Sequence, residues 1–267
     1  MNSIFSRTLK TLCTIAVVGV LVACGASSTV DPFKPTRVIG LGDGYNDSNR
    51  TLAPTVADQV ATNFGLGLSS VVNLGSTTGT ISSLSGQIGQ VTGGFTAGDL
   101  VVISVGAIDI KNTATTPNPT AISQVPELVS QIQWLLVHNV KHVLVMPTLD
   151  VSRTPWGATH TTESTAEFNG KILMQVGDSF GGRSPNPVIY ADVGLSPISS
   201  QFLSMTASTP FWYSPFNCFD FHSGTCSGSS TVSTSLFNTA TSDIYLTSAG
   251  NQWLGNLLYN ATAQGWR

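Results

Sequence analysis

The chain has 267 residues, of which 9% are charged and 41% hydrophobic, and its formal net charge is −3. A chain of this length can bury the core of one complete α/β domain. It carries no cluster of lysine and arginine, so we do not expect nucleic acid as a partner. No motif calls for a cofactor, and we expect neither a cofactor nor a metal.

The first 23 residues have the pattern of a secretory signal peptide. Arg7 and Lys10 form a short positive region, and the apolar stretch 12–22 follows it. This stretch is too short to span a bilayer comfortably, which argues against a permanent transmembrane helix. Leu21-Val22-Ala23-Cys24 resembles the bacterial lipobox, whose cysteine is lipidated and becomes the first residue of the mature protein.

The lipobox predicts an envelope protein that is anchored to a membrane through lipid on Cys24. Gly25, in place of aspartate after the cysteine, implies retention in the outer membrane of a Gram-negative bacterium. Ordinary cleavage nearby, with an unmodified cysteine, is the alternative. Residues 24–36 are then expected to form a flexible tether and residues 37–267 the folded domain. In the mature chain nine basic residues oppose 14 acidic ones, because Arg7 and Lys10 leave with the leader.

Five apolar runs predict strands that are buried on both faces, as in a parallel sheet. They are residues 38–41, 71–74, 100–105, 143–146 and 188–190. Apolar residues at helical spacing predict helices within 56–64, 125–136 and 254–261. Strands that alternate with helices indicate an α/β fold, with one open sheet covered by helices on both sides.

Ligand sites in such sheets lie beyond the carboxyl ends of the strands. Four loops follow strands directly, at residues 42–44, 75–79, 106–109 and 147–150, and we expect them to meet at one rim. The first is a strand-to-helix turn, where many hydrolases hold their nucleophile, and residues 45–49 look like the start of a helix. Its central residue is Gly44, which has no side chain that could attack a substrate.

The segments around these loops resemble, in chain order, the sequence blocks of the GDSL (SGNH) hydrolase family. The matching segments are GDGYNDSN (42–49), with Asp47 at the second aspartate of the block, VVNLGSTTG (71–79), LVVISVGAID (100–109), VLVMPTLDVSRTP (143–155) and YLTSAGN (245–251). The resemblance implies a three-layer α/β/α flavodoxin-like fold with a central parallel five-stranded sheet. It also implies an ester hydrolase, an esterase or lipase, wherever the catalytic residues are intact.

The catalytic positions of the family are substituted in this chain. In the family a serine attacks the ester carbonyl, a histidine three residues after an aspartate is the base, and an asparagine helps to hold the oxyanion. Gly44 stands at the serine and Ile108 at the asparagine. An ungapped match of the last block puts Ser242 at the aspartate and Tyr245 at the histidine. Tyrosine titrates near ~10, so Tyr245 is a poor base at neutral pH.

Shifting the last block by one residue does not restore a base. The shift recovers Asp243 as the acid, but Leu246 then stands at the histidine. Since the mechanism needs an oxygen nucleophile and an imidazole, the resemblance predicts a pseudoenzyme that binds a ligand or a partner. The backbone N–H groups of Gly44 and Gly79 are the expected oxyanion-type donors, with Gly75 as an alternative to Gly79.

Two other interpretations remain open. The chain could be an active ester hydrolase with relocated residues, such as Ser48 one helical turn past Gly44, or Asp220 and His222 as an acid and a base. It could also be a structural envelope protein whose cleft is incidental.

His138 and His142 flank the end of a predicted helix, where histidine commonly caps carbonyl groups.

Aromatic residues and two cysteines complete the candidate features. Trp156 and residues 211–213 could wall the rim, where they would suit an acyl chain or a glycan, or they could simply cover the edge of the sheet. Cys218 and Cys226 remain after the leader is removed. We expect them to form a disulfide, because a secreted protein meets an oxidising environment.

Overall fold

The structure is a computed structural model, and it describes residues 32–48, 54–113, 120–151, 156, 163–191, 193 and 248–266. One compact unit runs from Phe33 to Trp266. Cys24, Cys218 and Cys226 lie outside the described residues, so the lipidation site and the disulfide stay predictions. Among the described residues, no helix is long and apolar enough to span a bilayer.

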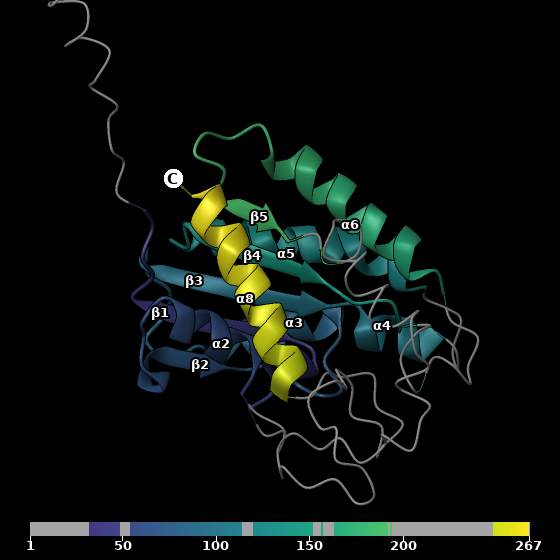
Figure 1. The fold of residues 1–267 in the computed structure, drawn as a ribbon. Helices are drawn as coiled ribbons and strands as arrows, with labels where there is room; N and C mark the ends of the chain where they lie inside the picture. The colour runs from purple at the N-terminus through teal and green to yellow at the C-terminus, as the bar shows by residue number, and fades with distance from the viewer. Residues whose placement is uncertain are drawn as a thin grey trace, which may run out of the picture. The chain divides into compact units, whose positions relative to one another are not determined.

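Five parallel strands form one sheet in the order β2-β1-β3-β4-β5 (Figure 1). They are β1 (Arg37–Gly42), β2 (Val71–Asn73), β3 (Asp99–Val105), β4 (His142–Pro147) and β5 (Val188–Tyr190). Every predicted strand is confirmed to within one residue at each end. All seven residues of β3, the central strand, are buried, which explains why its sequence is a continuous apolar run.

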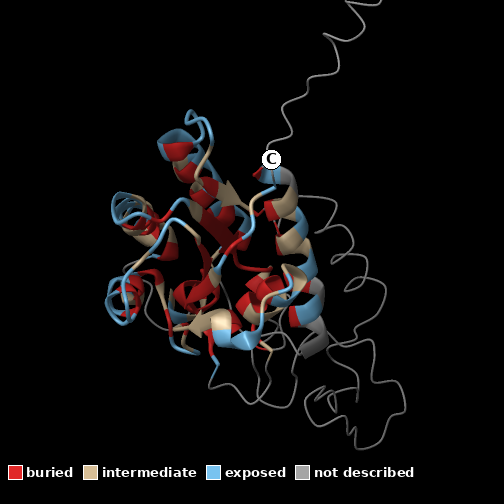
Figure 2. Cartoon of the chain, turned by 90° about the vertical axis from the view of Figure 1, so that its left-hand side faces the viewer, coloured by how far each residue is buried: buried red, intermediate tan, exposed pale blue. Residues whose placement is uncertain are grey.

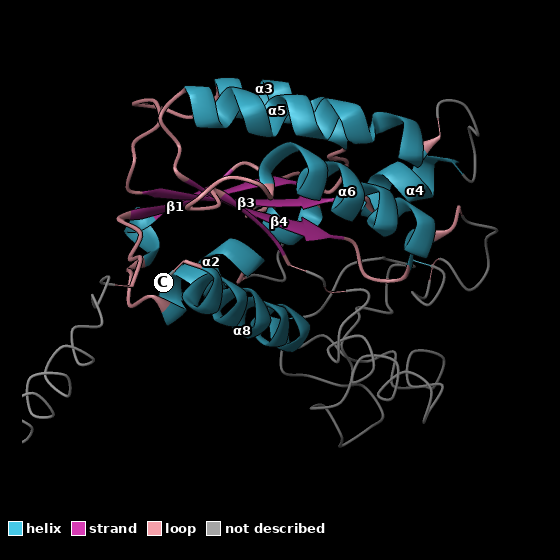
Figure 3. Cartoon of the chain, turned by 90° about the horizontal axis from the view of Figure 1, so that it is seen from above, coloured by secondary structure: helices cyan, strands magenta, loops and turns pink. Residues whose placement is uncertain are grey.

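Helices cover both faces of the sheet, so the three-layer α/β/α architecture is confirmed (Figure 3). One face carries α2 (Val56–Asn63) and α8 (Ser248–Gly265), and the other carries α3 (Leu84–Gly89), α5 (Val125–Val137) and α6 (Thr165–Phe180). The helix α4 (Ala107–Thr113) follows β3. Figure 2 shows the buried residues gathered on the sheet and on the helix sides that face it. Helical spacing predicted α2, α5 and α8 but missed α3, α4 and α6.

The predicted helix at residues 45–49 is wrong. Only one 3-10 turn, η1 (Gly44–Asn46), follows β1, and Asp47 already has an extended backbone, with φ −91° and ψ 107°. The next helix, α2, begins at Val56 behind a capping box formed by Thr55 and Asp58. Three further 3-10 turns are η2 (Leu68–Ser70), η3 (Ile81–Ser83) and η4 (Ala121–Gln124).

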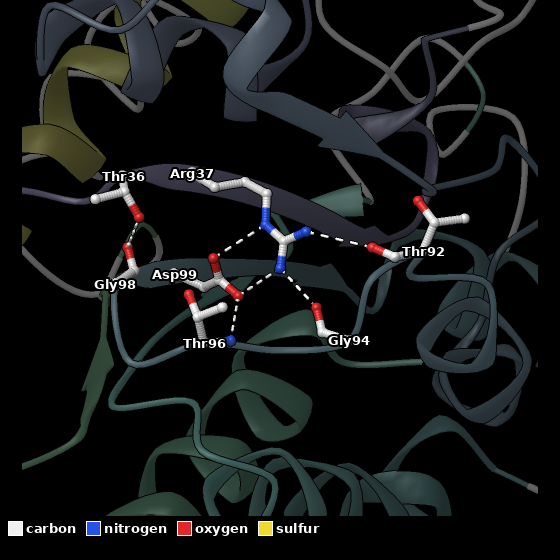
Figure 4. A network of polar contacts seen from close by, with 7 residues as sticks. All are labelled: Thr36, Arg37, Thr92, Gly94, Thr96, Gly98 and Asp99. Carbon is white, nitrogen blue, oxygen red and sulfur yellow. Dashed lines mark hydrogen bonds and ion pairs between the residues drawn. The ribbon is translucent and has the colours of Figure 1, made fainter.

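An ion pair joins β1 to β3 at the amino end of the sheet (Figure 4). Arg37 donates from Nε to Asp99 Oδ1 at 3.0 Å and from Nη2 to Asp99 Oδ2 at 2.6 Å. Its Nη2 also donates to the carbonyl of Gly94 at 2.7 Å, and the Thr96 N–H donates to Asp99 Oδ2 at 2.7 Å. The pair therefore holds both strands and the loop that leads into β3.

Aromatic rings hold both ends of the compact unit against the start of β4. Phe33 stacks on His142 with ring centroids 3.5 Å apart, and Trp266 meets both rings edge-on, at 5.5 and 4.8 Å. Trp266 Nε1 donates to the carbonyl of Asn186 at 2.7 Å. These contacts explain why the unit begins at Phe33.

The two histidines near the end of α5 have different roles. His138 Nδ1 lies 2.8 Å from the carbonyl oxygen of Trp134, as expected of a residue that caps a helix end. The capping role predicted for His142 is wrong, because its ring lies in the aromatic stack and its buried Nδ1 has no hydrogen-bond partner. Burial lowers the pKa of His142 to about 4, so this ring is neutral over most of the pH range.

Candidate functional site

The first two predicted loops contact each other at the carboxyl edge of the sheet, and the first loop also bonds to the end of β3. The N–H of Ser76 donates to the carbonyl of Gly42 at 3.1 Å, and the N–H of Asp43 donates to the carbonyl of Ser104 at 2.9 Å. The N–H of Thr77 donates to Asp47 Oδ2 at 2.9 Å. The rim predicted from the strand ends is therefore present in the structure.

The fourth loop, after β4, continues this edge beside β3. Val105 pairs with Pro147, so the loops that follow β3 and β4 leave the sheet side by side. Asn169 Nδ2 of α6 donates to the carbonyl of Thr148 at 2.8 Å and holds this loop. The α6 helix, which the helical spacing missed, thus positions one side of the rim.

Glycine is required at two points where the loops pack closely. Gly42 has φ +103°, and a Cβ on it would lie 1.8 Å from the carbonyl oxygen of Ser104. A Cβ on Gly79 would lie 2.1 Å from the carbonyl oxygen of Gly42. A side chain at either position would force the loops apart.

The Gln87 side chain holds the backbone of the first loop. Its Oε1 accepts the N–H of Gly42 at 2.6 Å, and its Nε2 donates to the carbonyl of Gly42 at 2.8 Å. Gln87 belongs to α3 and is 6% exposed. One buried amide therefore satisfies both backbone polar groups of a residue that is 45 positions away.

Asn46, in η1, ties the first loop to the sheet and to α2. Its Nδ2 lies within hydrogen-bonding distance of the carbonyls of Leu41 and Val102, at 3.0 and 3.1 Å. The same nitrogen is 3.1 Å from Ser104 Oγ, and Asn46 Oδ1 accepts the N–H of Ala57 at 3.1 Å. Asn46 is fully buried, so these contacts fix the position of the turn.

Asp109 lies beneath the rim and joins the second loop to the third. Its Oδ1 accepts the N–H of Ile81 at 3.1 Å, and its Oδ2 accepts the N–H of Gly106 at 3.2 Å. Burial, and to a smaller extent the nearby charge of Asp43, raise the pKa of this carboxyl to about 7, against the lowering effect of the N–H donors. Asp109 can therefore change its charge near neutral pH.

Comparison with solved structures places this arrangement among known folds. A structure described as a GDSL-like lipase, from Parabacteroides merdae, matches with a TM-score of 0.58 and 13% identity, over 87% of this chain and 98% of that one. The chain has a GDSL/SGNH hydrolase-like fold. An α/β hydrolase enzyme from the metagenome of Lake Arreo matches with a TM-score of 0.52 and 14% identity, over 85% of this chain and 94% of that one. No protein-family model matches the sequence, and no curated protein sequence matches it.

Within this GDSL-like fold, two of the four substituted positions fall on described elements at the rim. Gly44 opens η1 and is buried, and Ile108 lies in the first turn of α4 with 6% of its surface exposed. Neither residue can act as a nucleophile, and the side chain of Ile108 cannot donate a hydrogen bond to an oxyanion. Ser242 and Tyr245, with Asp243 and Leu246, lie outside the described residues, as do Asp220 and His222.

The second proposed oxyanion donor is engaged within its own turn. The N–H of Gly79 donates to the carbonyl of Ser76 at 2.7 Å. A substrate oxygen could use this donor only if the turn opened or the N–H were shared. Gly75, the alternative, packs closely on the first loop. A Cβ added to it would lie 2.5 Å from the carbonyl oxygen of Asp43.

Two further sequence candidates, Ser48 and Trp156, fall on described residues. Ser48 is exposed and follows η1 in a turn, so the helical face that would align it with Gly44 does not exist. Trp156 is 7% exposed, and Lys111 Nζ lies 5.5 Å from its ring centroid, so its ring is covered rather than open. Residues 211–213 lie outside the described residues. Among the described residues no group of histidine, cysteine and carboxylate side chains could hold a metal ion.

Sequence reasoning missed Gln87, Asn46 and the role of Asp109. Each makes its contacts with backbone groups of other segments, which leave no local pattern in the sequence. The resemblance included Asp109 in a matching block but gave it no function. The signal that could have found them is a polar residue within an otherwise apolar face, such as Gln87 between Leu84 and Ile88.

Proposed function

We propose that this chain is a lipid-anchored envelope protein whose GDSL-like domain binds a ligand or a protein partner and does not hydrolyse esters. The observation that carries the proposal is Gly44, a residue without a side chain at the position where the fold presents a nucleophile. Ile108, at the position of the oxyanion asparagine, is consistent with the same conclusion.

The chemical cost of these substitutions supports a loss of catalysis. Nucleophile and base act as a unit, and removing either costs about a millionfold in kcat in a well-studied serine hydrolase. Gly44 removes the nucleophile alone. The backbone donors that remain could supply only a small fraction of the original rate enhancement, because they stabilise a charge that no attack generates.

The buried hydrogen bonds that hold the rim support a binding function rather than a site without any function. Gln87 satisfies both backbone groups of Gly42, and Asn46 connects the same turn to β3 and α2. A loop held by buried hydrogen bonds loses little conformational freedom when a ligand binds, which favours affinity. We propose an acyl or glycan group as the ligand, in keeping with the uncharged and aromatic composition of the segments expected at the rim.

Anchoring is the second part of the proposal and has its own support. The basic, apolar leader ends in the lipobox-like Leu21–Cys24, and Cys24 is the residue that would carry the lipid. We propose the outer membrane as the location, because Gly25 follows the cysteine. This part does not depend on whether the domain is catalytic.

The decisive experiment measures hydrolysis of p-nitrophenyl acetate and p-nitrophenyl octanoate by the full chain, together with labelling by a serine-directed fluorophosphonate. We expect no turnover above buffer and no labelled protein. Ser48→Ala and His222→Ala are the matched variants. Turnover at ordinary enzyme rates, about 1–1,000 s⁻¹, that is lost in either variant would show that the chemistry has moved to relocated residues.

A further inference from the structure

Asp109 is the side chain through which two loops of the rim are connected. Ile81, whose N–H it accepts, opens η3 directly after the second loop, and Gly106, whose N–H it also accepts, opens the third loop. The two bonds use different oxygens of the carboxylate, and Asp109 is only 5% exposed. Its state of charge therefore bears on the geometry of both loops.

A second buried carboxylate lies on the first loop. Asp43 is fully buried, its Oδ1 accepts the N–H of Tyr45 at 3.2 Å, and its charge acts on Asp109. Two like charges in a poorly hydrated environment repel each other, and one proton relieves the repulsion. The pKa of Asp109, raised to about 7 by burial and then by Asp43, agrees with this arrangement.

The other charged groups nearby are occupied elsewhere or exposed. Asp47 accepts the N–H of Thr77, Lys111 lies over the ring of Trp156, and Glu127 of α5 accepts from Ser82 at 3.3 Å. Glu167 and Lys171 of α6 lie on its more exposed sides. The turns η3 and η4, and the helix α3, carry no charged residue. Among the described residues, Asp43 is thus the charged group that acts on Asp109.

Protonation changes what the Asp109 carboxyl can bind. A carboxylate accepts hydrogen bonds strongly at both oxygens, whereas a carboxylic acid uses one oxygen as a donor and accepts more weakly. A proton on Asp109 therefore weakens one of its bonds to Ile81 and Gly106.

We propose that Asp109 is a proton-operated clamp between η3, which follows the second loop, and the third loop. In the charged state Asp109 accepts the N–H groups of Ile81 and Gly106 firmly. In the neutral state it holds one of these N–H groups less tightly. The clamp operates whether the domain binds or hydrolyses its ligand.

The test is an NMR titration of the full chain from pH 5 to 9, with ¹⁵N-labelled isoleucine and glycine. We expect the amide resonances of Ile81 and Gly106 to move with one common midpoint near 7. Ile132 and Gly98, residues of the same types on α5 and at the amino end of the sheet, are the internal controls and should not follow this midpoint.

Two variants test whether Asp109 is the group that titrates and whether the charge of Asp43 affects it. Asp109→Asn should abolish the common midpoint, and Asp43→Asn should move it to lower pH, because it removes the charge that favours the proton. If Asp109→Asn does not fold, the direction of the shift in Asp43→Asn still decides. Flat Ile81 and Gly106 resonances, or a midpoint that survives Asp109→Asn, would each overturn the clamp.

Discussion

Gln87 binds both backbone polar groups of Gly42, accepting its N–H at 2.6 Å and donating to its carbonyl at 2.8 Å. This contact adds a side chain to the hydrogen bonds at the end of β1, where the carbonyl of Gly42 also accepts the N–H of Ser76. Because Gly42 and Gln87 are both buried, neither partner has water as an alternative. The shape of the first loop therefore depends on a residue of α3.

The first prediction concerns the stability of this contact. Gln87→Met keeps the length of the side chain but leaves the N–H of Gly42 without a partner, while the carbonyl of Gly42 still accepts the N–H of Ser76, so we expect a loss of about 1–3 kcal/mol in the free energy of unfolding. Gln90→Met, at an exposed position of the same segment, is the control and should change stability by less than about 0.5 kcal/mol. Urea denaturation measures both. Equal stability of the two variants would show that Gln87 does not hold the loop.

A second prediction follows from the ion pair at the amino end of the sheet. Arg37→Ala leaves the buried carboxylate of Asp99 without its guanidinium, and we expect a loss of about 3 kcal/mol, near the low end for a buried pair because the Arg37 side chain is 23% exposed. Arg183→Ala is the control, since Arg183 is exposed and contacts only the Phe180 ring at 5.3 Å in the part of the chain described. Its loss should stay within about 1 kcal/mol. Comparable losses in both variants would contradict a special role for the Arg37–Asp99 pair.

The third prediction is that Asp109 makes the protein less stable as pH rises. Its pKa is raised from the usual 3.8 to about 7, so between these values the native state binds a proton that the unfolded state has released. The free energy of unfolding should therefore fall as pH rises from about 4 to about 7 and stay level above that. Asp109→Asn should remove this slope, measured by urea denaturation at several pH values. A slope that persists in the variant would assign it to another group.

His142 should act in the opposite direction over an overlapping range. Its pKa is lowered from 6.5 to about 4, so on acidification the unfolded state takes up a proton before the native state does. Its contribution to stability is complete above pH 6.5 and is lost as pH falls towards 4. His142→Phe should remove this loss, because phenylalanine can keep the stack on Phe33, whereas His138→Phe, at an exposed position, should not. The contributions of His142 and Asp109 to the pH dependence of stability have opposite signs. The contribution of each residue is therefore seen clearly only in the variant that lacks the other.

The sequence allowed the sheet to be predicted but not the contacts that shape the rim. Burial on both faces makes each strand a continuous apolar run, so β1 to β5 can be read locally. The helix α3 has only six residues, so its apolar face repeats too few times to give a helical pattern. The turn after Gly44 was mistaken for a helix because Asn46 and Asp47 use their side chains on distant backbone groups, which no local pattern shows.

The substituted site itself was predictable only through resemblance. The substitutions that we propose at Gly44 and Ile108 can be inferred because the surrounding blocks resemble those of the GDSL family, and both residues lie at the rim. In contrast, the sequence gives no indication that the N–H of Gly79 already donates to Ser76. Backbone orientation within a tight turn depends on packing against other loops, here against the carbonyl of Gly42.

The last prediction is that catalysis can be restored only by replacing all the missing groups together. The backbone conformation at position 44 suits a serine, because Gly42 and Gly106, but not Gly44, are among the described glycines with positive φ. Gly44→Ser alone supplies an oxygen without a base, and Ser242→Asp with Tyr245→His supplies a base without an oxygen, so each should leave ester hydrolysis at the parent level. The combination with Ile108→Asn, which adds the oxyanion donor, should raise hydrolysis of p-nitrophenyl acetate well above the parent and allow fluorophosphonate labelling. An unchanged rate in the stable quadruple variant would mean that the rim does not hold a hydrolase geometry, and activity from Gly44→Ser alone would mean that a base is already present.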